Sequence, residues 1–266
     1  MTLAPGLCSI TLRGLPADDV VTVATRAGIE GIEWGADRHA LPGGGHAVAA
    51  LAQRCRDAGI EVASYGSYLG AGPADDDVDA ALDSAEALGA PMVRIWTELG
   101  VTPASPSGDR QRVVDRTALL VDAIEARGLT PTLEFHPGTL THTAAATTAL
   151  LDALDRPHVR THWQPDPALA TGDAVDGLRA VADRLAHLHV FAWGPDGIAA
   201  RHPLAAGAAL WPPALAVASE HGAPLPGRRF ALCEYVRDDD PDQLVADVAT
   251  LRGWLTATVR PSGPGQ

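Results

Sequence analysis

The chain has 266 residues, 46% of them hydrophobic, and a formal net charge of −13 at pH 7. This length suits one (β/α)₈ barrel or two small domains. The negative charge, without a cluster of arginines, argues against nucleic acid as a partner. No apolar run reaches the roughly 18 residues that cross a bilayer, so no membrane partner is expected. All 20 basic residues are arginine, which excludes chemistry that needs a lysine, such as a Schiff base.

Signals for secretion and for disulfides are weak in this sequence. Residues 1–14 hold neither a basic stretch nor a long apolar stretch, so we predict no signal peptide and a cytoplasmic protein. The three cysteines, Cys8, Cys55 and Cys233, are scattered, and no two have the spacing of metal ligands. We therefore predict that each is a small apolar residue in or near a core element.

Short apolar runs alternate with longer helical patterns along the whole chain. The eight runs predicted as strands cover residues 7–12, 31–34, 60–65, 92–96, 130–135, 159–164, 185–191 and 230–236. The helical patterns cover residues 17–27, 46–58, 75–88, 110–127, 144–154, 174–183, 208–221 and 241–257. Several of these begin at a capping residue, such as Thr143, and end at a glycine, such as Gly28 or Gly89. Strand and helix in alternation indicate parallel strands joined by crossover helices.

Eight such units in one chain of this length predict a single-domain (β/α)₈ barrel over residues 1–258. We expect a disordered C-terminal tail over residues 259–266. The alternative is a doubly wound open sheet, whose first strand leads into a glycine-rich phosphate-binding turn. Residues 9–14, at the end of the first predicted strand, contain no such turn, which favours the barrel.

The C-terminal ends of barrel strands point into one shared pocket, so polar residues at these ends are candidates for the site. Glu134 and His136 share one face of their strand, as do His187 and His189 of theirs. Carboxylates and imidazoles that converge near one axis suit a divalent cation bound through oxygen and nitrogen. The sequence leaves Mn²⁺, Mg²⁺, Co²⁺ and Zn²⁺ open. A structural alternative is that Glu134 and Glu234 are ion-paired to Arg94 or to another arginine.

Five segments resemble the xylose isomerase-like barrels: EGIEWG (30–35), TLEFH (132–136), HWQP (162–165), HLHV (187–190) and LCE (232–234). In the ketose epimerases of that group, a Glu, an Asp, a His and a Glu bind the metal. The resemblance places these ligands at Glu134, Gln164, His189 and Glu234. Gln164 departs from the pattern, because an amide can bind a metal only through its neutral oxygen. Arg201 resembles the arginine that follows the histidine ligand in those epimerases.

The resemblance implies an isomerase or epimerase that removes a proton beside the carbonyl of a sugar or polyol. Glu134 and Glu234 would exchange the proton from opposite sides of the substrate. Arg201 would steady the enediolate oxygen. The residues expected to contact the substrate are Trp34, His39, Tyr65, Arg94, Trp96, His136 and Arg201.

Three other functions compete with this one. A dehydratase of the inosose dehydratase kind would start with the same proton abstraction. A sugar-binding barrel that lost its metal through Gln164 would not be an enzyme. A DNA-repair endonuclease needs more metal ligands and a basic face, which the charge disfavours. The lack of lysine also makes an aldose–ketose isomerase of the xylose isomerase kind less expected than an epimerase. Homo-oligomerisation is left open by the sequence.

Overall fold

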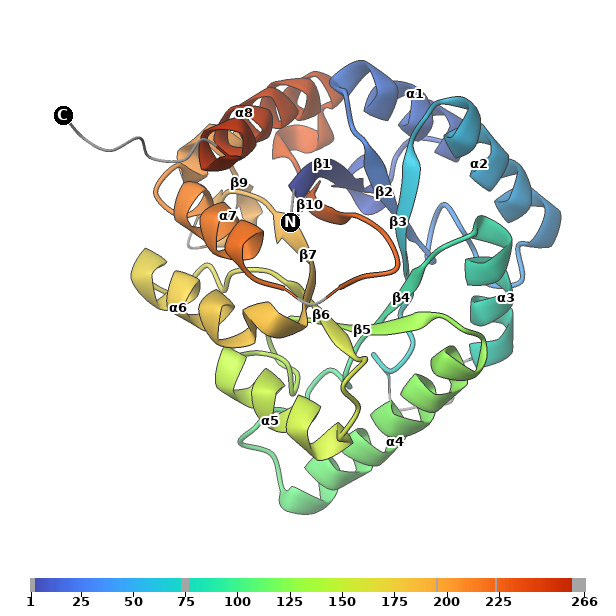
Figure 1. The fold of residues 1–266 in the computed structure, drawn as a ribbon, viewed down its shortest axis with the longest axis vertical. Coiled ribbons are helices and arrows are strands. Elements are labelled where there is room, and N and C mark those ends of the chain that lie inside the picture. Colours follow the sequence, from blue (N-terminus) through green and yellow to red (C-terminus); the bar gives the residue numbers. More distant parts are fainter. Residues whose placement is uncertain (1–2, 73–76, 195, 223, 260–266) are drawn as a thin grey trace.

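The computed structural model describes residues 3–72, 77–194, 196–222 and 224–259. Eight parallel strands close into a barrel in the order β1-β10-β7-β6-β5-β4-β3-β2 (Figure 1). Their bounds are β1 Leu3–Cys8, β2 Gly31–Gly35, β3 Glu61–Gly66, β4 Met92–Ile95, β5 Thr130–Glu134, β6 Arg160–Trp163, β7 Leu185–Val190 and β10 Arg229–Cys233. The predicted single-domain (β/α)₈ barrel is thus confirmed, and the open sheet is excluded because β1 pairs with both β2 and β10.

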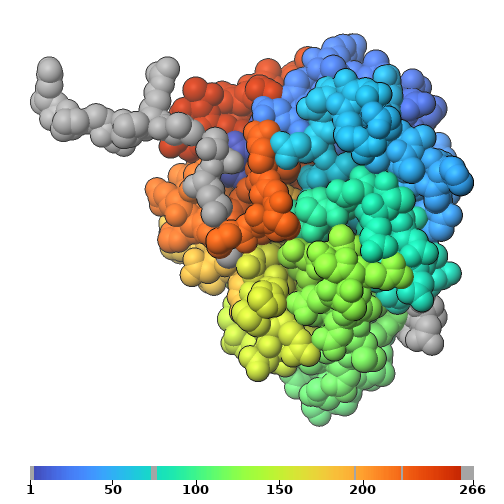
Figure 2. All heavy atoms as spheres, turned by 45° about the vertical axis from the view of Figure 1, so that its right-hand side comes forward, coloured from blue at the N-terminus to red at the C-terminus, as the bar shows by residue number. Residues whose placement is uncertain are grey.

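Helices cover the outside of the barrel and follow one another in chain order around it (Figures 1 and 2). They are α1 Ala17–Ala27, α2 Gly45–Asp57, α3 Val78–Leu88, α4 Ser107–Ala126, α5 Ala144–Leu154, α6 Thr171–Val181, α7 Trp211–Glu220 and α8 Pro241–Val259. A small hairpin of β8 Trp193–Gly194 and β9 Gly197–Arg201 follows β7. The tail expected over residues 259–266 lies outside the described residues, apart from the last residue of α8. No described helix combines the length and the apolar character needed to cross a membrane.

Local sequence signals set the helix ends. The Thr143 hydroxyl accepts a hydrogen bond from the Ala146 N–H and caps the start of α5. Gly28 and Gly89 end α1 and α3 with φ angles of 75° and 73°, in the left-handed region that glycine adopts without strain. The helix predicted to begin at residue 75 begins at Val78 instead, because the side chain of Asp77 accepts a hydrogen bond from the Ala80 N–H and caps the helix there. Residues 73–76 lie outside the described part.

The first strand differs from its prediction by several residues. It runs from Leu3 to Cys8, whereas residues 7–12 were predicted, and a 3₁₀ helix occupies Ser9–Leu12. Side chains of this turn bond to neighbouring backbone in place of a strand ladder. Ser9 Oγ accepts from the Gly35 N–H at 2.9 Å, and the Thr11 hydroxyl donates to the Cys233 carbonyl at 3.1 Å. Cys8 therefore stands at the C-terminal end of β1, where barrel strands end at the shared pocket.

The hydrophobic core lies between the barrel wall and the helices. Trp34, Trp163 and Trp211 are almost fully buried there. The inside of the barrel is instead partly polar. His187 lies in it, accepts from the Phe230 N–H at 3.2 Å and has Nε2 3.2 Å from the Ala63 carbonyl. Burial lowers the pKa of His187 to about 4, so this histidine is a neutral structural residue.

Candidate metal and substrate site

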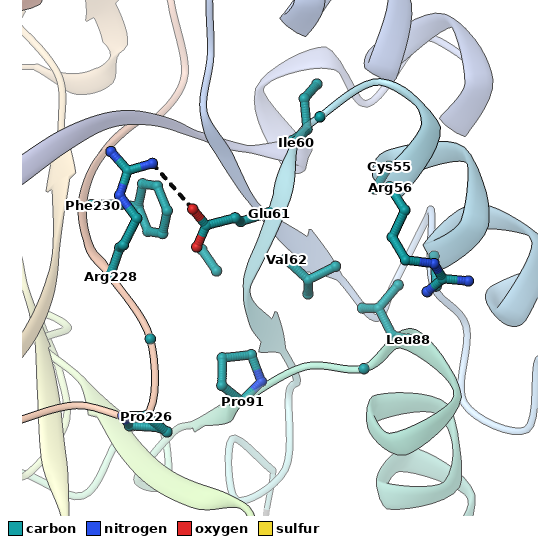
Figure 3. A pocket seen from close by; sticks show the side chains of 15 residues that line it. Cys55, Arg56, Ile60, Glu61, Val62, Leu88, Pro91, Pro226, Arg228 and Phe230 are labelled. Carbon is teal, nitrogen blue, oxygen red and sulfur yellow. Dashed lines mark hydrogen bonds and ion pairs between the residues drawn. The ribbon is translucent and has the colours of Figure 1, made fainter.

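Two cavities lie at opposite ends of the barrel. The larger, about 520 Å³, opens where the strands begin and is lined by Val62, Leu88 and Phe230 among others (Figure 3). Its charged groups are already paired, since Arg228 contacts Glu61 at 3.1 Å and also bonds to Glu30 outside the cavity. The rest of its described lining holds no histidine, and its Arg56 bonds to Gln53 while burial raises the pKa of the Cys55 thiol to about 11. The chemistry therefore belongs to the cavity at the other end.

The second cavity, about 250 Å³, lies at the C-terminal ends of the strands. This is the end at which barrel enzymes of every kind carry their active sites. Its lining combines charged, amide and aromatic groups from most of the strands: Ile10, Tyr68, Arg94, Trp96, Glu134, His136, Pro137, Gln164, Trp193, Ile198, Glu234 and Tyr235.

Arg94 forms the electrostatic centre of this site. Its Nε lies 3.3 Å from Glu33 Oε1, and its Nη1 bonds to Glu134 Oε2. All three side chains are at most 7% exposed. Ser64 Oγ donates a hydrogen bond of 2.6 Å to Glu33 Oε2 and fixes that carboxylate further. Burial opposes ionisation of both glutamates, but Arg94 and the neighbouring histidines together outweigh it and hold the pKa of each below its usual value.

His189 lies between three carboxylates. Its Nε2 is 3.4 Å from Glu33 Oε1, and its Nδ1 is 3.4 Å from Glu134 Oε1 and 3.7 Å from Glu234 Oε2. Burial disfavours the protonated ring, but the anionic groups raise the pKa of His189 well above its usual value. Glu234, which has no arginine partner among the described residues, responds in the opposite way to Glu134. Burial raises the pKa of Glu234 to about 7, against the attraction of His189.

Two backbone features hold the charged groups in place. Gly66 leaves space beside Arg94, because a Cβ at this position would lie 2.8 Å from Arg94 Nη2 and 3.1 Å from Glu33 Oε1. Tyr235, directly after Glu234, has φ = 49°, a left-handed conformation that is strained for an aromatic residue. Its N–H bonds to Thr11 Oγ1 at 3.0 Å, which holds the strained turn and so the direction of Glu234.

Aromatic residues form two walls of the cavity. On one side Trp96 packs against His136 with ring centroids 4.1 Å apart, and Tyr68 follows at 5.6 Å. On the other side Trp193 stacks on Phe191 at 3.8 Å. The indole N–H groups of Trp96 and Trp193 are buried without a hydrogen-bond partner in the described structure. Each can donate to an oxygen of a bound molecule, while the rings offer an apolar face.

The structure brings most of the predicted site residues together. Arg94, Trp96, Glu134, His136, Gln164 and Glu234 line the cavity, and His189 lies beneath it. The structural alternative holds in part, because Glu134 is indeed paired with Arg94. Gln164 donates its amide N–H to the Phe135 carbonyl, which leaves its Oε1 as the atom that could reach a ligand.

Four predicted substrate contacts lie elsewhere. Trp34 and Tyr65 are fully buried in the hydrophobic core, on the outer side of the barrel wall. His39 is tied to Ser9 and to the Leu15 carbonyl and does not line the cavity. Arg201, at the end of β9, pairs with Asp239 and donates to the Val236 carbonyl. None of the four lines the cavity as the structure stands, so we leave them out of the site.

Two site residues escaped the sequence analysis. Glu33 was overlooked in favour of its neighbour Trp34, although the side chain of Glu33 is the one that faces the barrel axis. Cys8, predicted to be an apolar core residue, has its Sγ 3.7 Å from Glu33 Oε1. The same Sγ atom lies within 4.8 Å of donor atoms of His189 and Glu234, and these three residues could together hold a metal ion. Correct placement of the end of β1 would have revealed Cys8.

The residues present fit a divalent cation. Within the described residues, both ring nitrogens of His189 and Nε2 of His162 are buried without a hydrogen-bond partner. Three buried carboxylates, of Glu33, Glu134 and Glu234, face a single guanidinium. Buried carboxylates in such excess need a cation or a proton to compensate them.

Comparison with known proteins agrees with this architecture. The chain belongs to the xylose isomerase-like TIM barrel family, whose model matches residues 21–254. A search of curated protein sequences gave no match.

Among solved structures, the chain is similar to a probable 3-DHS dehydratase, AsbF, involved in petrobactin synthesis, from Bacillus anthracis. The TM-score is 0.78, with 20% identity over 95% of this chain and 99% of that one. It is also similar to D-allulose 3-epimerase from Methylomonas sp., with a TM-score of 0.67 and 18% identity over 96% and 98% of the two chains. A third is a xylose isomerase-like barrel from Mycobacterium smegmatis in complex with magnesium, with a TM-score of 0.67 and 15% identity over 97% and 98%. At these identities the likeness shows the fold alone.

Proposed function

We propose that this chain is a divalent-metal-dependent isomerase or epimerase that removes a proton beside the carbonyl of a sugar or polyol. The observation that carries the proposal is the cluster of Glu33, Glu134 and Glu234 around His189, whose ring nitrogens have no hydrogen-bond partner in the described structure. An excess of buried carboxylates with unpaired imidazole nitrogens is a donor set for a cation such as Mn²⁺, Mg²⁺, Co²⁺ or Zn²⁺.

Glu134, Gln164, His189 and Glu234 would hold the ion. When bound, it would supply a Lewis acid that polarises the substrate carbonyl and acidifies the adjacent C–H bond. The protein's own residues move the proton. Glu234 is the better base, since its carboxylate has no arginine partner among the described residues. Glu134 stands three strands away along the barrel, beyond β7 and β6, and Arg94 fixes its orientation.

The cavity suits a small polyhydroxylated molecule. Its volume of about 250 Å³ is small, and its walls combine aromatic faces with polar donors. Trp96 and Trp193 offer indole N–H groups to substrate oxygens, and Gln164 offers an amide. This combination of apolar faces and precisely placed polar groups is how proteins bind small molecules. We therefore propose a small sugar or polyol as substrate, and no nucleic acid.

Dehydration of a cyclic polyol is the second candidate. The unequal surroundings of the two carboxylates favour it, because elimination of water needs one base beside the carbonyl and does not need two equivalent bases. Glu234 could fill that role alone while Glu134 stays paired with Arg94. The AsbF dehydratase has the same fold, which is compatible with this chemistry.

Proton exchange in D₂O tests both candidates before the substrate is known. Purified protein is incubated with a panel of ketoses and cyclic polyol ketones, with each of the four metal ions in turn. We expect deuterium at the carbon beside the carbonyl of one substrate, detected by mass spectrometry. An epimer as product supports the first candidate, and a product that has lost water supports the second. The proposal fails if no member of the panel exchanges with any metal.

A matched pair of variants assigns the base. Glu234→Gln should slow exchange by at least about 100-fold, the usual range for a lost general base. Glu98→Gln is the control, because Glu98 is also a buried carboxylate beyond the end of β4 but pairs with Arg112 and does not line the cavity. Exchange by Glu234→Gln at the rate of the unmodified protein would rule out Glu234 as the base.

A further inference from the structure

The sulfur atom of Cys8 lies beside two of the proposed metal ligands, His189 and Glu234. Cys8 ends β1, His189 lies in β7 and Glu234 follows β10, and these three strands are neighbours in the barrel. Donor atoms of the three side chains lie within 4.8 Å of one another. All three residues are at least 90% buried, so the cluster is shielded from bulk solvent.

The surroundings of these atoms point to a ligand rather than to packing. Both ring nitrogens of His189 are buried and lack a hydrogen-bond partner in the described part of the chain. A buried polar atom without a partner costs free energy, so native proteins rarely keep one without a reason. Cys8 Sγ faces the same space, with Glu33 Oε1 at 3.7 Å. Cys55, by contrast, belongs to α2 and is buried in the hydrophobic core.

We propose that the Cys8 thiolate is a ligand of the divalent ion, together with His189 and Glu234, and that neither Gln164 nor Glu134, which is paired with Arg94, is a ligand. This inference rests on the proposed metal-dependent function. A thiolate and a carboxylate neutralise a doubly charged ion, whereas the Gln164 amide brings no charge. Gln164 is also engaged elsewhere, since its N–H donates to the Phe135 carbonyl. It is then free to contact the substrate from the cavity wall.

The distances are compatible with coordination after a small contraction. Zinc bonds of about 2.3 Å to sulfur and about 2.0 Å to nitrogen place two ligands of a tetrahedral site roughly 3.5 Å apart. Donor atoms within 4.8 Å of one another reach this geometry through side-chain movements of about 1 Å. Three protein ligands with an open fourth position are typical of catalytic zinc sites.

A sulfur ligand changes the choice of metal. Thiolates favour Zn²⁺ and the softer transition ions over Mg²⁺, which prefers oxygen. We therefore expect Zn²⁺ or Co²⁺ to bind this chain much more tightly than Mg²⁺. A metal-bound cysteine is deprotonated, so binding releases the thiol proton.

Cobalt spectroscopy of the full-length protein tests the proposal without an activity assay. The protein is stripped with a chelator and titrated with Co²⁺ alone. A cobalt–thiolate bond produces a charge-transfer band in the near ultraviolet, which oxygen and nitrogen ligands do not produce. We expect this band in the unmodified protein and in Cys55→Ser, and its loss in Cys8→Ser. Zn²⁺ affinity, measured by competition with Co²⁺, should fall by at least about 100-fold in Cys8→Ser, more than for a lost outer-shell partner.

Two further measurements separate the alternatives. Gln164→Ala should keep both the band and the Zn²⁺ affinity, because Gln164 is not a ligand in this proposal. Unchanged melting of metal-free Cys8→Ser shows that its fold persists. Co²⁺ binding without the band, or a band that survives in Cys8→Ser, overturns Cys8 as a ligand but leaves the proposed function standing. If the unmodified protein binds no divalent ion at all, the proposed function and this inference both fail.

Discussion

Replacement of Arg94 with methionine measures how much this guanidinium stabilises the fold through its two buried carboxylate partners. Arg94 is 6% exposed and faces Glu33 and Glu134, which are 3% and 4% exposed. Methionine fills a similar volume but removes the guanidinium partner of both carboxylates. Removal of one partner of a buried ion pair costs about 3–5 kcal/mol. At roughly 2–4 °C per kcal/mol for a domain of this size, the melting temperature should fall by roughly 6–20 °C.

The assay is urea unfolding followed by circular dichroism, in a chelator so that no metal substitutes for the guanidinium. Arg112→Met is the matched control. Its guanidinium pairs with Glu98 but is 48% exposed, and loss of such a solvent-screened pair should cost far less stability than loss of Arg94. A loss for Arg94→Met no larger than that of the control would refute the reasoning. The triple variant that also carries Glu33→Gln and Glu134→Gln should recover much of the lost stability.

The effect of pH on Arg94→Met has a definite sign. Arg94 lowers the folded-state pKa of Glu33 and Glu134 below the usual value of 4.5. A carboxyl with a lowered folded pKa stabilises the fold above its unfolded pKa, and this contribution is lost as the pH falls through the folded pKa. The difference in unfolding free energy between the unmodified protein and Arg94→Met should therefore be full at pH 7 and shrink below pH 4.5. A difference that stays constant across this range would mean that the carboxyls are not ionised in the fold.

Three further predictions concern single positions. Gly66→Ala places a Cβ 2.8 Å from a guanidinium nitrogen, so it should cost about 1–3 kcal/mol in urea unfolding, whereas Gly72→Ala, with nothing within 4 Å, should cost far less. Trp96→Ala should raise KM about tenfold, the equivalent of about 1.4 kcal/mol of lost contact. Trp34→Phe should lower the melting temperature and leave KM unchanged. The reverse pattern would show that Trp34 contacts the substrate. Asp247→Asn should gain stability relative to the unmodified protein as the pH rises above 3.8, because burial raises the pKa of Asp247 and the ionised form is disfavoured in the fold; a pH-independent difference in unfolding free energy would contradict this.

The barrel could be predicted from the sequence because the apolar strand run and the helical pattern each repeat eight times along the chain. A strand placed a few residues off does not change the alternation of strand and helix. The site is less tolerant of such shifts. The end of β1 was placed four residues late, and this hid the position of Cys8 at the end of a strand. The turn at Ser9–Leu12 is apolar enough to continue the strand pattern, and only the hydrogen bonds of Ser9 and Thr11 to other strands end it.

The sequence also does not predict which side chains of a strand face the barrel axis. Strands of a parallel barrel are buried on both faces, so the apolar and polar positions do not alternate cleanly. Glu33 and Trp34 are both buried, and the sequence does not say which faces inward. The same holds for Ser64 and Tyr65, of which Ser64 faces Glu33. The contact between Glu33 and Ser64 depends on the register of β2 and β3, which the sequence does not show.

The pairing of β1 with β10 has a consequence for how the protein folds and unfolds. Cys8 and Glu234 are brought together only when the first strand meets the last, which is the contact of greatest separation along the chain. Contacts of this kind form late, because a long loop must close before they contribute. An ion bound by both residues would cross-link the first and last strands of the closed barrel. It would therefore slow unfolding more than it accelerates folding, and prolong the lifetime of the native state.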